Sequence, residues 1–295
     1  MQGKRMGIVG AGGFIGGRLA ARAQEKGWEV VGFSRRPRVS NGVVSEWRIW
    51  NEAPVLSGLD AVVNLAGEAI DQRWTDAHKQ AFRSSRVGVT QTLVDALETC
   101  SERPEVLLNG SAVGIYGDRG EEILPESAVA GEGFLADLCR DWEAVAFRAA
   151  PCRVLVWRTG VVLGVGGAAW GKMKRVFSWG LGGNFGSGRQ WMPWIHVEDL
   201  VGGMLHALEA GISGPVNGVA PEPVRNEELT RELAKVLGRP AILHAPAWAL
   251  KVGLGEFASA LLASQRAIPR ALEESGYAFR FARLPEALED LVGGA

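Results

Sequence analysis

Three glycines near the start of the chain have the spacing of a loop that binds phosphate groups. Gly10, Gly13 and Gly16 form a G-x-x-G-x-x-G motif between an apolar run at 6–10 and a stretch of helical periodicity that ends at Gly27. Glycines let the backbone turn tightly and approach a pyrophosphate, whose charge the free N–H groups and dipole of a helix N-terminus stabilise. Because strand, loop and helix follow in the required order, we predict a dinucleotide site; the alternative is an ordinary glycine turn.

The residues after the second predicted strand, 29–34, indicate which dinucleotide binds. An acidic side chain here would hydrogen-bond the ribose 2′-hydroxyl of NAD and repel the 2′-phosphate of NADP. Instead the strand ends in Ser34, Arg35 and Arg36, with Arg38 close behind. A hydroxyl and two guanidinium groups suit a phosphate, because arginine can bind its oxygens through two parallel hydrogen bonds. We therefore predict NADP(H); the alternative is a solvated basic turn.

Apolar runs alternate with helical stretches through the first half of the chain. The runs lie at 6–10, 29–34, 47–50, 61–67, 106–112 and 153–164. The clearest helical stretches are 75–99 and 133–149. Nearly continuous apolar strands that alternate with helices predict a parallel sheet covered on both faces, which is a doubly wound α/β fold of the Rossmann type.

The composition changes after Gly164. The chain becomes rich in glycine and tryptophan, and later mixes proline with short helical stretches, while 192–210 has the pattern of one more strand and helix of the main sheet. Ligands of doubly wound folds lie at the carboxyl edge of the sheet, where a smaller region would cover them. We predict a Rossmann domain formed by 1–165 and 193–215, and a smaller substrate-binding region formed by 166–192 and 216–295.

Composition argues against several functional classes. Hydrophobic residues make up 47% of the 295 residues and charged residues 22%, as in soluble globular proteins. The net charge of −1 gives no overall attraction to nucleic acid or to an anionic membrane. No apolar run reaches the about 20 residues of a membrane span. The three cysteines form no CxxC pair and the four histidines no cluster. We expect a cytoplasmic protein without a bound metal.

With these motifs in view, the chain resembles the extended short-chain dehydrogenase/reductase superfamily. The resemblance rests on the glycine loop, NLAG at 64–67, SAVGIYG at 111–117 and WIHVEDL at 194–200. Longer stretches such as RTGVVLG and GLGGNFGSGRQWMPWIHVEDL resemble an atypical group of NAD-dependent epimerase/dehydratase-like proteins of uncertain substrate. The match runs nearly from end to end.

The resemblance implies a Rossmann-type NAD(P) domain, a small C-terminal substrate domain and a set of cofactor contacts. The glycine loop would face the pyrophosphate, Ser34 and Arg35 the 2′-phosphate, and NLA at 64–66 the adenosine side. Arg86 is a further candidate, the alternative being an ordinary salt bridge. The full set of predicted cofactor residues is Gly10, Gly13, Phe14, Ile15, Gly16, Ser34, Arg35, Arg36, Asn64, Leu65, Ala66 and Arg86.

The acid–base pair that the resemblance implies is missing. Working members of the superfamily use Tyr-x-x-x-Lys on the helix after the fifth strand, where the lysine charge lowers the pKa of the tyrosine. On this helix, GFLADLCRDWE places Phe134 and Leu138 at the two positions. Neither of the two tyrosines of the chain, Tyr116 and Tyr277, is followed by a lysine four residues later.

Tyr116, just after the fifth predicted strand, and Ser111, at the end of that strand, are the candidate substitutes. Tyr116 could donate a proton and Ser111 could bind an oxyanion, with Lys172 or Arg158 supplying positive charge through space. The S-A-x-x-x-Y-G spacing is one residue longer than the common pattern, so Ser111 need not occupy the usual place of the serine. The alternative is that Tyr116 only forms a wall beside the nicotinamide.

The glycine-rich loop at 180–194 is the candidate substrate site. Its glycines allow close approach of the backbone, and its polar groups and one indole could line a pocket for a polar, anionic small molecule. The alternative is a hairpin with an exposed arginine. His196 could bind substrate or act as a base, although a structural role at the start of the next helix is the stronger hypothesis. The predicted substrate residues are Arg189, Gln190, Trp191 and His196.

The function expected from these residues is that of an NADP(H)-dependent oxidoreductase acting on an unknown small polar substrate. A non-catalytic NADP(H) sensor or partner-binding module is the alternative from another class, because the Tyr/Lys pair is absent. A sugar-nucleotide epimerase is a weaker alternative, since epimerisation depends on the same missing base. The chain could be a monomer or a homodimer, because the helix at 75–99 shows no clear second apolar stripe.

Overall fold

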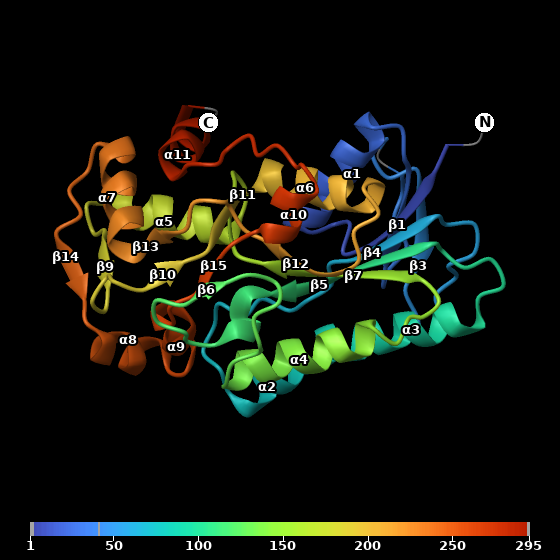
Figure 1. Cartoon of the computed structure of the whole chain (residues 1–295), viewed down its shortest axis with the longest axis horizontal. Coiled ribbons are helices and arrows are strands. Elements are labelled where there is room, and N and C mark those ends of the chain that lie inside the picture. The colour runs from blue at the N-terminus through green and yellow to red at the C-terminus, as the bar shows by residue number, and fades with distance from the viewer. Residues whose placement is uncertain (1–2, 41, 294–295) are drawn as a thin grey trace.

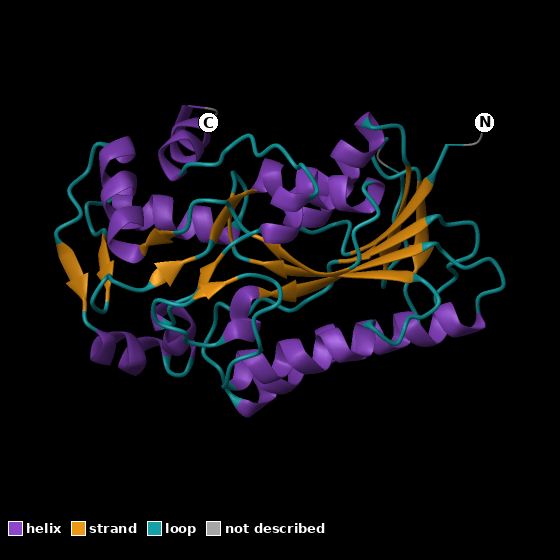
Figure 2. Ribbon diagram, viewed as in Figure 1, coloured by secondary structure: helices purple, strands orange, loops and turns teal. Residues whose placement is uncertain are grey.

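A seven-stranded parallel sheet forms the centre of the molecule in a computed structural model, which describes residues 3–40 and 42–293. Its strand order is β12-β7-β5-β4-β1-β2-β3, and the strands run side by side in Figure 2. This arrangement confirms the predicted doubly wound α/β fold. The strands are β1 (Arg5–Val9), β2 (Glu29–Ser34), β3 (Glu46–Ile49), β4 (Ala61–Asn64), β5 (Val106–Ala112), β7 (Arg153–Thr159) and β12 (Gly214–Gly218).

Helices cover both faces of this sheet (Figure 1). One face packs against α1 (Phe14–Glu25) and α6 (Val197–Glu209), and the other against α3 (Val89–Thr99) and α4 (Phe134–Ala146). The interior strands are apolar on both sides because both sides are buried, which explains their continuous hydrophobic runs. The predicted helix at 75–99 consists of α2 (Asp76–Arg83), a π-helical turn η1 (Ser84–Gly88) and α3.

The helix predicted within 192–210 does cover the main sheet, as α6, but the strand predicted before it does not join that sheet. Its strand β11 (Trp194–His196) pairs with β8 (Val161–Leu163) in a separate two-stranded sheet, and β12 is the seventh strand instead. The predicted run at 153–164 accordingly divides into β7 and β8 at Gly160. A side chain at Gly160 would meet the carbonyl oxygen of Pro193, so the chain can change sheets here only with glycine.

A smaller region packs at the carboxyl end of the sheet. It contains three further two-stranded pairs, β6–β15, β9–β14 and β10–β13, and its own apolar core. The predicted domain boundary at 215 falls inside β12, which lies wholly in the main sheet. The remaining helices and strands outside the main sheet are η2 (Val113–Tyr116), β6 (Ile123–Leu124), α5 (Ala168–Ser178), β9 (Gly183–Phe185), β10 (Trp191–Met192), β13 (Val224–Arg225), α7 (Asn226–Leu237), β14 (Leu243–Ala245), α8 (Ala247–Leu254), α9 (Phe257–Leu262), β15 (Arg266–Ala267), α10 (Arg270–Glu274) and α11 (Leu284–Gly293).

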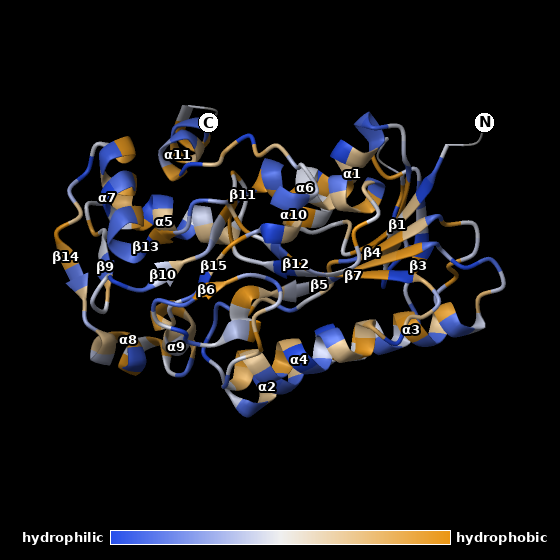
Figure 3. Ribbon diagram, viewed as in Figure 1, coloured by the Kyte–Doolittle hydropathy of each residue, from blue (hydrophilic) through white to orange (hydrophobic). Residues whose placement is uncertain are grey.

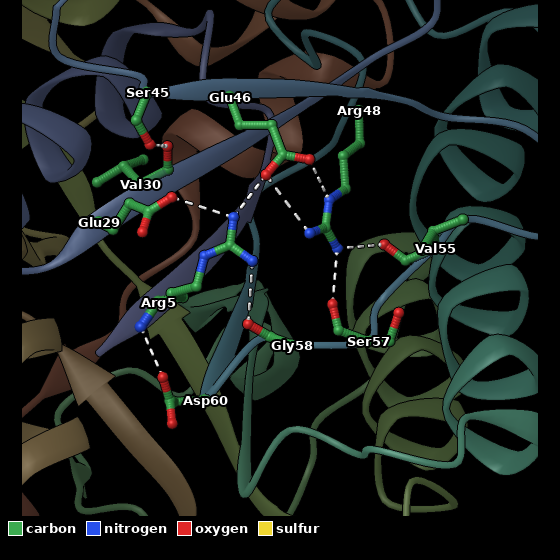
Figure 4. A network of polar contacts seen from close by, with 10 residues as sticks. All are labelled: Arg5, Glu29, Val30, Ser45, Glu46, Arg48, Val55, Ser57, Gly58 and Asp60. Carbon is green, nitrogen blue, oxygen red and sulfur yellow. Dashed lines mark hydrogen bonds and ion pairs between the residues drawn. The ribbon is translucent and has the colours of Figure 1, made fainter. Parts of the chain in front are cut away.

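At the opposite, amino end of the sheet, a network of charged side chains links neighbouring strands (Figure 4). Arg5 at the start of β1 pairs with Glu46 at 2.5 Å and Glu29 at 3.1 Å, and Arg48 binds the other oxygen of Glu46 at 2.8 Å. These contacts join β1, β2 and β3 at the edge farthest from the glycine loop.

No helix among the described residues is long and apolar enough to cross a membrane.

Candidate functional site

The glycine loop connects the carboxyl end of β1 to the start of α1. Gly10 has φ of +90°, and a side chain there would lie 3.1 Å from the backbone of Leu65. A side chain at Gly16 would overlap the carbonyl oxygen of Gly10, so the helix can approach the loop this closely only with glycine. The N-cap residue of α1 is Gly13, which has no side chain to accept a hydrogen bond from the first N–H groups of the helix. The first turn of the helix also carries no acidic residue. The N-terminus of α1 is therefore available to an anion.

The two predicted residues between Gly13 and Gly16 are half-buried. The ring of Phe14 packs against the turn after β8, where a side chain at Gly164 or Gly167 would collide with it. Ile15 packs against the core cluster beneath the sheet. Both residues thus fix the first turn of α1 between the sheet and the smaller region.

Three arginines lie at the carboxyl end of β2, beside the glycine loop. Arg35, Arg36 and Arg38 are exposed, and none of their guanidinium groups forms a hydrogen bond or ion pair with another described residue. The guanidinium group of Arg38 stacks over the Trp47 ring, 5.0 Å from its centroid. It also lies against the loop, since a side chain at Gly12 would come within 2.5 Å of it.

Arg38, which the sequence indicated only as part of a solvated basic turn, therefore belongs to the site. Its position four residues past the end of β2 gave no reason to place it on the glycine loop. The stacking on Trp47, which comes from the neighbouring strand β3, directs it there. Ser34, by contrast, is half-buried, and its hydroxyl accepts a hydrogen bond from the backbone N–H of Arg36 at 3.3 Å.

The NLA turn after β4 borders the glycine loop, but the Asn64 side chain points away from it. Asn64 is fully buried and donates to Asn109 Oδ1 at 2.7 Å and Thr90 Oγ1 at 3.0 Å. Its own Oδ1 accepts from the N–H of Ala66 at 3.2 Å. Asn64 thus has no exposed surface for a cofactor and instead shapes the turn, whereas Leu65 and Ala66 are half-buried at the edge of the sheet.

Arg86 lies on the π-helical turn η1 and points at the NLAG turn. Its guanidinium group donates to the carbonyl oxygen of Glu68 at 2.9 Å and lies 5.5 Å from the centroid of the Trp142 ring. No carboxylate among the described residues pairs with it, so the ordinary salt bridge considered from sequence is not formed. Burial lowers the pKa of Arg86, opposed by charges on neighbouring residues. π-Helical turns often occur at functional sites.

The first turns of α4, where an acid–base pair would stand, are apolar. Phe134 and Leu138 belong to a cluster with Trp74 and Phe82, and the rings of Phe134 and Trp74 lie 5.4 Å apart. On the adjacent face, Leu135 packs against Gly114 of η2. None of these side chains can transfer a proton.

Tyr116 and Ser111 both belong to one buried polar network. Tyr116 Oη donates to Asn217 Oδ1 at 2.7 Å and accepts from Arg158 Nη1 at 2.9 Å. Ser111 Oγ donates to Glu143 Oε1 at 2.6 Å, and Glu143 holds Arg158 through two further hydrogen bonds of 2.9 Å. All five residues are at most 7% exposed.

The charge near Tyr116 thus comes from Arg158, while Lys172 pairs with Asp71. Burial raises the pKa of Tyr116, and the attraction of Arg158 only partly opposes it. A neutral phenol whose hydroxyl is already bonded on both sides is poorly placed to exchange a proton with a ligand. The catalytic role of Tyr116 stays a prediction that requires the network to open.

The predicted substrate residues Arg189, Gln190 and Trp191 have three different environments. Arg189 is exposed, and Gln190 is buried with its amide donating to the carbonyl of Phe185 at 3.0 Å. The Trp191 ring lies between the guanidinium groups of Arg225 and Arg266, each 4.5 Å from its centroid. The loop is not a hairpin, because β9 and β10 pair with different strands.

His196 has the structural role considered from sequence. Its Nδ1 accepts the N–H of Glu198 at 3.2 Å and so caps α6, and its ring lies 4.1 Å from that of Phe281. Only 2% of the residue is exposed. Burial lowers its pKa, opposed by Asp290, whose carboxylate lies 3.5 Å from Nε2.

Comparison with known proteins found a matching family model and similar proteins in other organisms. The model of the NAD dependent epimerase/dehydratase family matches residues 6–219, and a domain of unknown function (DUF1731) matches 245–291. The chain is similar to the epimerase family protein Mb2239 of Mycobacterium bovis, with 40% identity over 292 residues that cover 95% of each chain. It is 36% identical over 302 residues to the chloroplastic SDR39U1 homolog of Arabidopsis thaliana, covering 97% of this chain and 86% of that one.

Similarity extends to a solved structure. The crystal structure of the human epimerase family protein SDR39U1 with NADPH has a TM-score of 0.91 and 35% sequence identity to this chain. The match covers 99% of this chain and 100% of that one. The smaller region therefore aligns together with the sheet.

Proposed function

The chain belongs to the NAD dependent epimerase/dehydratase family, and from this membership and the site geometry we propose that it binds NADP(H) and acts as an oxidoreductase on a small polar substrate. One observation carries the cofactor assignment. The uncapped N-terminus of α1 lies beside three guanidinium groups that have no anionic partner among the described residues. Such an arrangement suits a dinucleotide with an additional phosphate.

The charges at the end of β2 support NADP(H) over NAD(H). None of residues 34–45 is acidic, so no carboxylate directly after β2 would accept a hydrogen bond from a 2′-hydroxyl. Arg35, Arg36 and Arg38 would bind the 2′-phosphate, and the loop from Gly10 to Gly16 the pyrophosphate. The human relative whose structure contains NADPH is consistent with this choice.

Arg86 would act as a second anchor for the cofactor. Its guanidinium group has no carboxylate partner among the residues that the structure describes and lies on the NLAG turn, at the same carboxyl edge of the sheet. The usual lysine on α4 is absent, and Arg86 provides a fixed positive charge near that helix, stacked on its Trp142. Bound NADP(H) would supply or accept a hydride, while the chain itself would orient it.

A non-catalytic NADP(H) sensor is the second candidate, and two observations favour it. The first turns of α4 are filled by packed apolar side chains, and Tyr116 is held neutral inside a buried network. A sugar-nucleotide epimerase is a weaker candidate, because it needs the same missing base. Turnover of a defined carbonyl compound that Tyr116→Phe abolishes would support the oxidoreductase; NADPH binding without turnover would support the sensor.

The decisive experiment compares the affinities of NADPH and NADH for the native protein and for Arg35→Ala/Arg36→Ala by titration calorimetry. Each charge-assisted hydrogen bond lost should cost roughly 1.5–3 kcal/mol, or about 10- to 150-fold in Kd, for NADPH only. Arg231→Ala, an exposed arginine on α7, is the matched control and should change neither affinity. Equal losses for both nucleotides, or no binding of either, would contradict the proposal.

A further inference from the structure

Large apolar side chains are exposed on elements that lie toward the end of the molecule opposite the N-terminus, as Figure 1 places those elements. They come from α5 and the turn after it, from β14 with the residue before it, and from α8. We name them the α5–α8 surface: Val176 (41% exposed), Trp179 (69%), Leu181 (52%), Ile242 (82%), Leu243 (48%), Trp248 (70%) and Val252 (71%).

Two of these three segments are in direct contact, and α8 follows the second of them along the chain. The N–H of Leu243 donates to the carbonyl of Gly182 at 3.2 Å, which brings Ile242 and Leu243 beside Leu181. Val176 and Trp179 occupy one exposed face at the end of α5. Only Pro246 separates β14 from α8, and the start of β14 is strongly hydrophobic in Figure 3.

Helix α8 lacks the packing expected of its sequence. Its eight residues, AWALKVGL, include a single charged residue, yet none of them is buried. Trp248, Lys251 and Val252 share its most exposed face. An apolar helix with no buried residue on a monomer marks an interaction surface.

The two chain segments that form this surface carry basic side chains and no acidic ones. Residues 144–197 and 233–255 contain no Asp or Glu. Arg175, Arg239 and Lys251 are exposed and form no ion pair or side-chain hydrogen bond with another described residue. All charged side chains of these two segments are therefore basic, although the net charge of the whole chain is −1; the acidic residues of the neighbouring α7 lie outside them.

We propose that the α5–α8 surface docks on an anionic phospholipid membrane. Exposed tryptophans and aliphatic side chains suit the boundary between headgroups and acyl chains, and unpaired lysine and arginine side chains suit anionic headgroups. A second copy of the chain fits less well, because a symmetric contact would bring two copies of the same positively charged surface together, with no carboxylate from 144–197 or 233–255 to oppose it. The proposal does not depend on cofactor binding.

Cosedimentation with vesicles tests this inference on the full chain. We expect binding to phosphatidylcholine/phosphatidylglycerol vesicles (3:1) that is at least tenfold stronger than to phosphatidylcholine alone and that weakens in high salt. Trp179→Ser/Trp248→Ser and, separately, Arg175→Glu/Lys251→Glu should each lower it at least tenfold. The matched controls, Val129→Ser and Arg148→Glu, alter similarly exposed residues away from this surface and should leave it unchanged.

Three outcomes would overturn the proposal. The native protein could fail to bind anionic vesicles, or both pairs of surface substitutions could leave binding unchanged while thermal unfolding shows intact variants. Light scattering could also reveal a native dimer that Trp179→Ser/Trp248→Ser converts to a monomer without any vesicle binding. That last result would assign the surface to self-association.

Discussion

Individual residues at this site act through partners that are distant in sequence. Tyr116 is held by Arg158 and Asn217, from two other strands of the sheet. The phenol is therefore neutral and structural in the closed network, although its place after β5 suggested catalysis. Tyr277, the other tyrosine, is similarly fixed, with its hydroxyl 3.2 Å from Asp199 Oδ1.

Both tyrosines should resist ionisation in the folded protein. Burial raises the pKa of each, and the nearby Asp199 carboxylate adds to the effect at Tyr277. Absorbance at 295 nm should show little phenolate at pH 10 when the protein is folded in buffer. In guanidinium chloride, the same titration should show a midpoint of phenol ionisation at about pH 10. Because the folded-state pKa values are raised, the stability they contribute is complete below about pH 10 and is lost at higher pH.

The single variants Tyr116→Phe and Tyr277→Phe assign the two titrations. A phenol that titrates near pH 10 in the native protein would show that its network opens readily, and for Tyr116 would revive a direct role in proton transfer.

At the scale of elements, the β1–α1 junction depends on where a side chain can fit. A methyl group at Gly16 would overlap the carbonyl oxygen of Gly10, whereas one at Gly17 would meet only the carbonyl oxygen of Ala11 at 3.6 Å. Adjacent glycines in one helix thus have different reasons to be present.

The matched pair Gly16→Ala and Gly17→Ala tests whether only Gly16 is required by the close approach of the loop. Gly17→Ala should be neutral or stabilise the protein by up to about 1 kcal/mol, through the better helix propensity of alanine. Gly16→Ala should lower Tm and weaken NADPH binding at least tenfold, because the loop must move away from α1. Differential scanning fluorimetry with and without NADPH measures both effects. Similar behaviour of the two variants would show that the loop tolerates displacement.

Across the whole molecule, a buried ion pair connects the sheet to the smaller region. Glu143 on α4 and Arg158 on β7 are paired at 2.9 Å with side chains 7% and 8% exposed. Arg158 extends the network through Tyr116 to Asn217, whose amide donates to the carbonyls of Leu124 and Ile268. The sheet, η2 and the segment before α10 are thereby held together.

Removing one partner of this pair should cost more than removing both. Glu143→Ala would leave Arg158 buried without a counter-charge, and should lower the free energy of unfolding by about 3–5 kcal/mol in urea denaturation. Glu143→Leu/Arg158→Met should be less destabilising. Asp137→Ala, which breaks an exposed pair on the same helix, should cost at most about 1 kcal/mol. Equal costs for Glu143→Ala and Asp137→Ala would refute a structural role for the pair.

Elements whose signal is local could be predicted from the amino-acid sequence alone. The strands at 29–34 and 106–112 and the glycine loop follow from apolar runs and from glycine spacing, because a buried parallel strand and a helix N-terminus each constrain a few consecutive residues. The missing acid–base pair on α4 was equally readable, since it depends on the identity of single side chains.

Features that depend on contacts between distant segments could not be predicted in this way and became visible in the folded chain. Strand β12, with the sequence GPVNG, has little intrinsic strand propensity and becomes the seventh strand through its pairing with β7. Arg38 reaches the glycine loop because Trp47 supports it, and Tyr116 is neutral because elements from across the chain enclose it. Burial and charge pairing depend on positions in space, and spacing along the chain does not determine them.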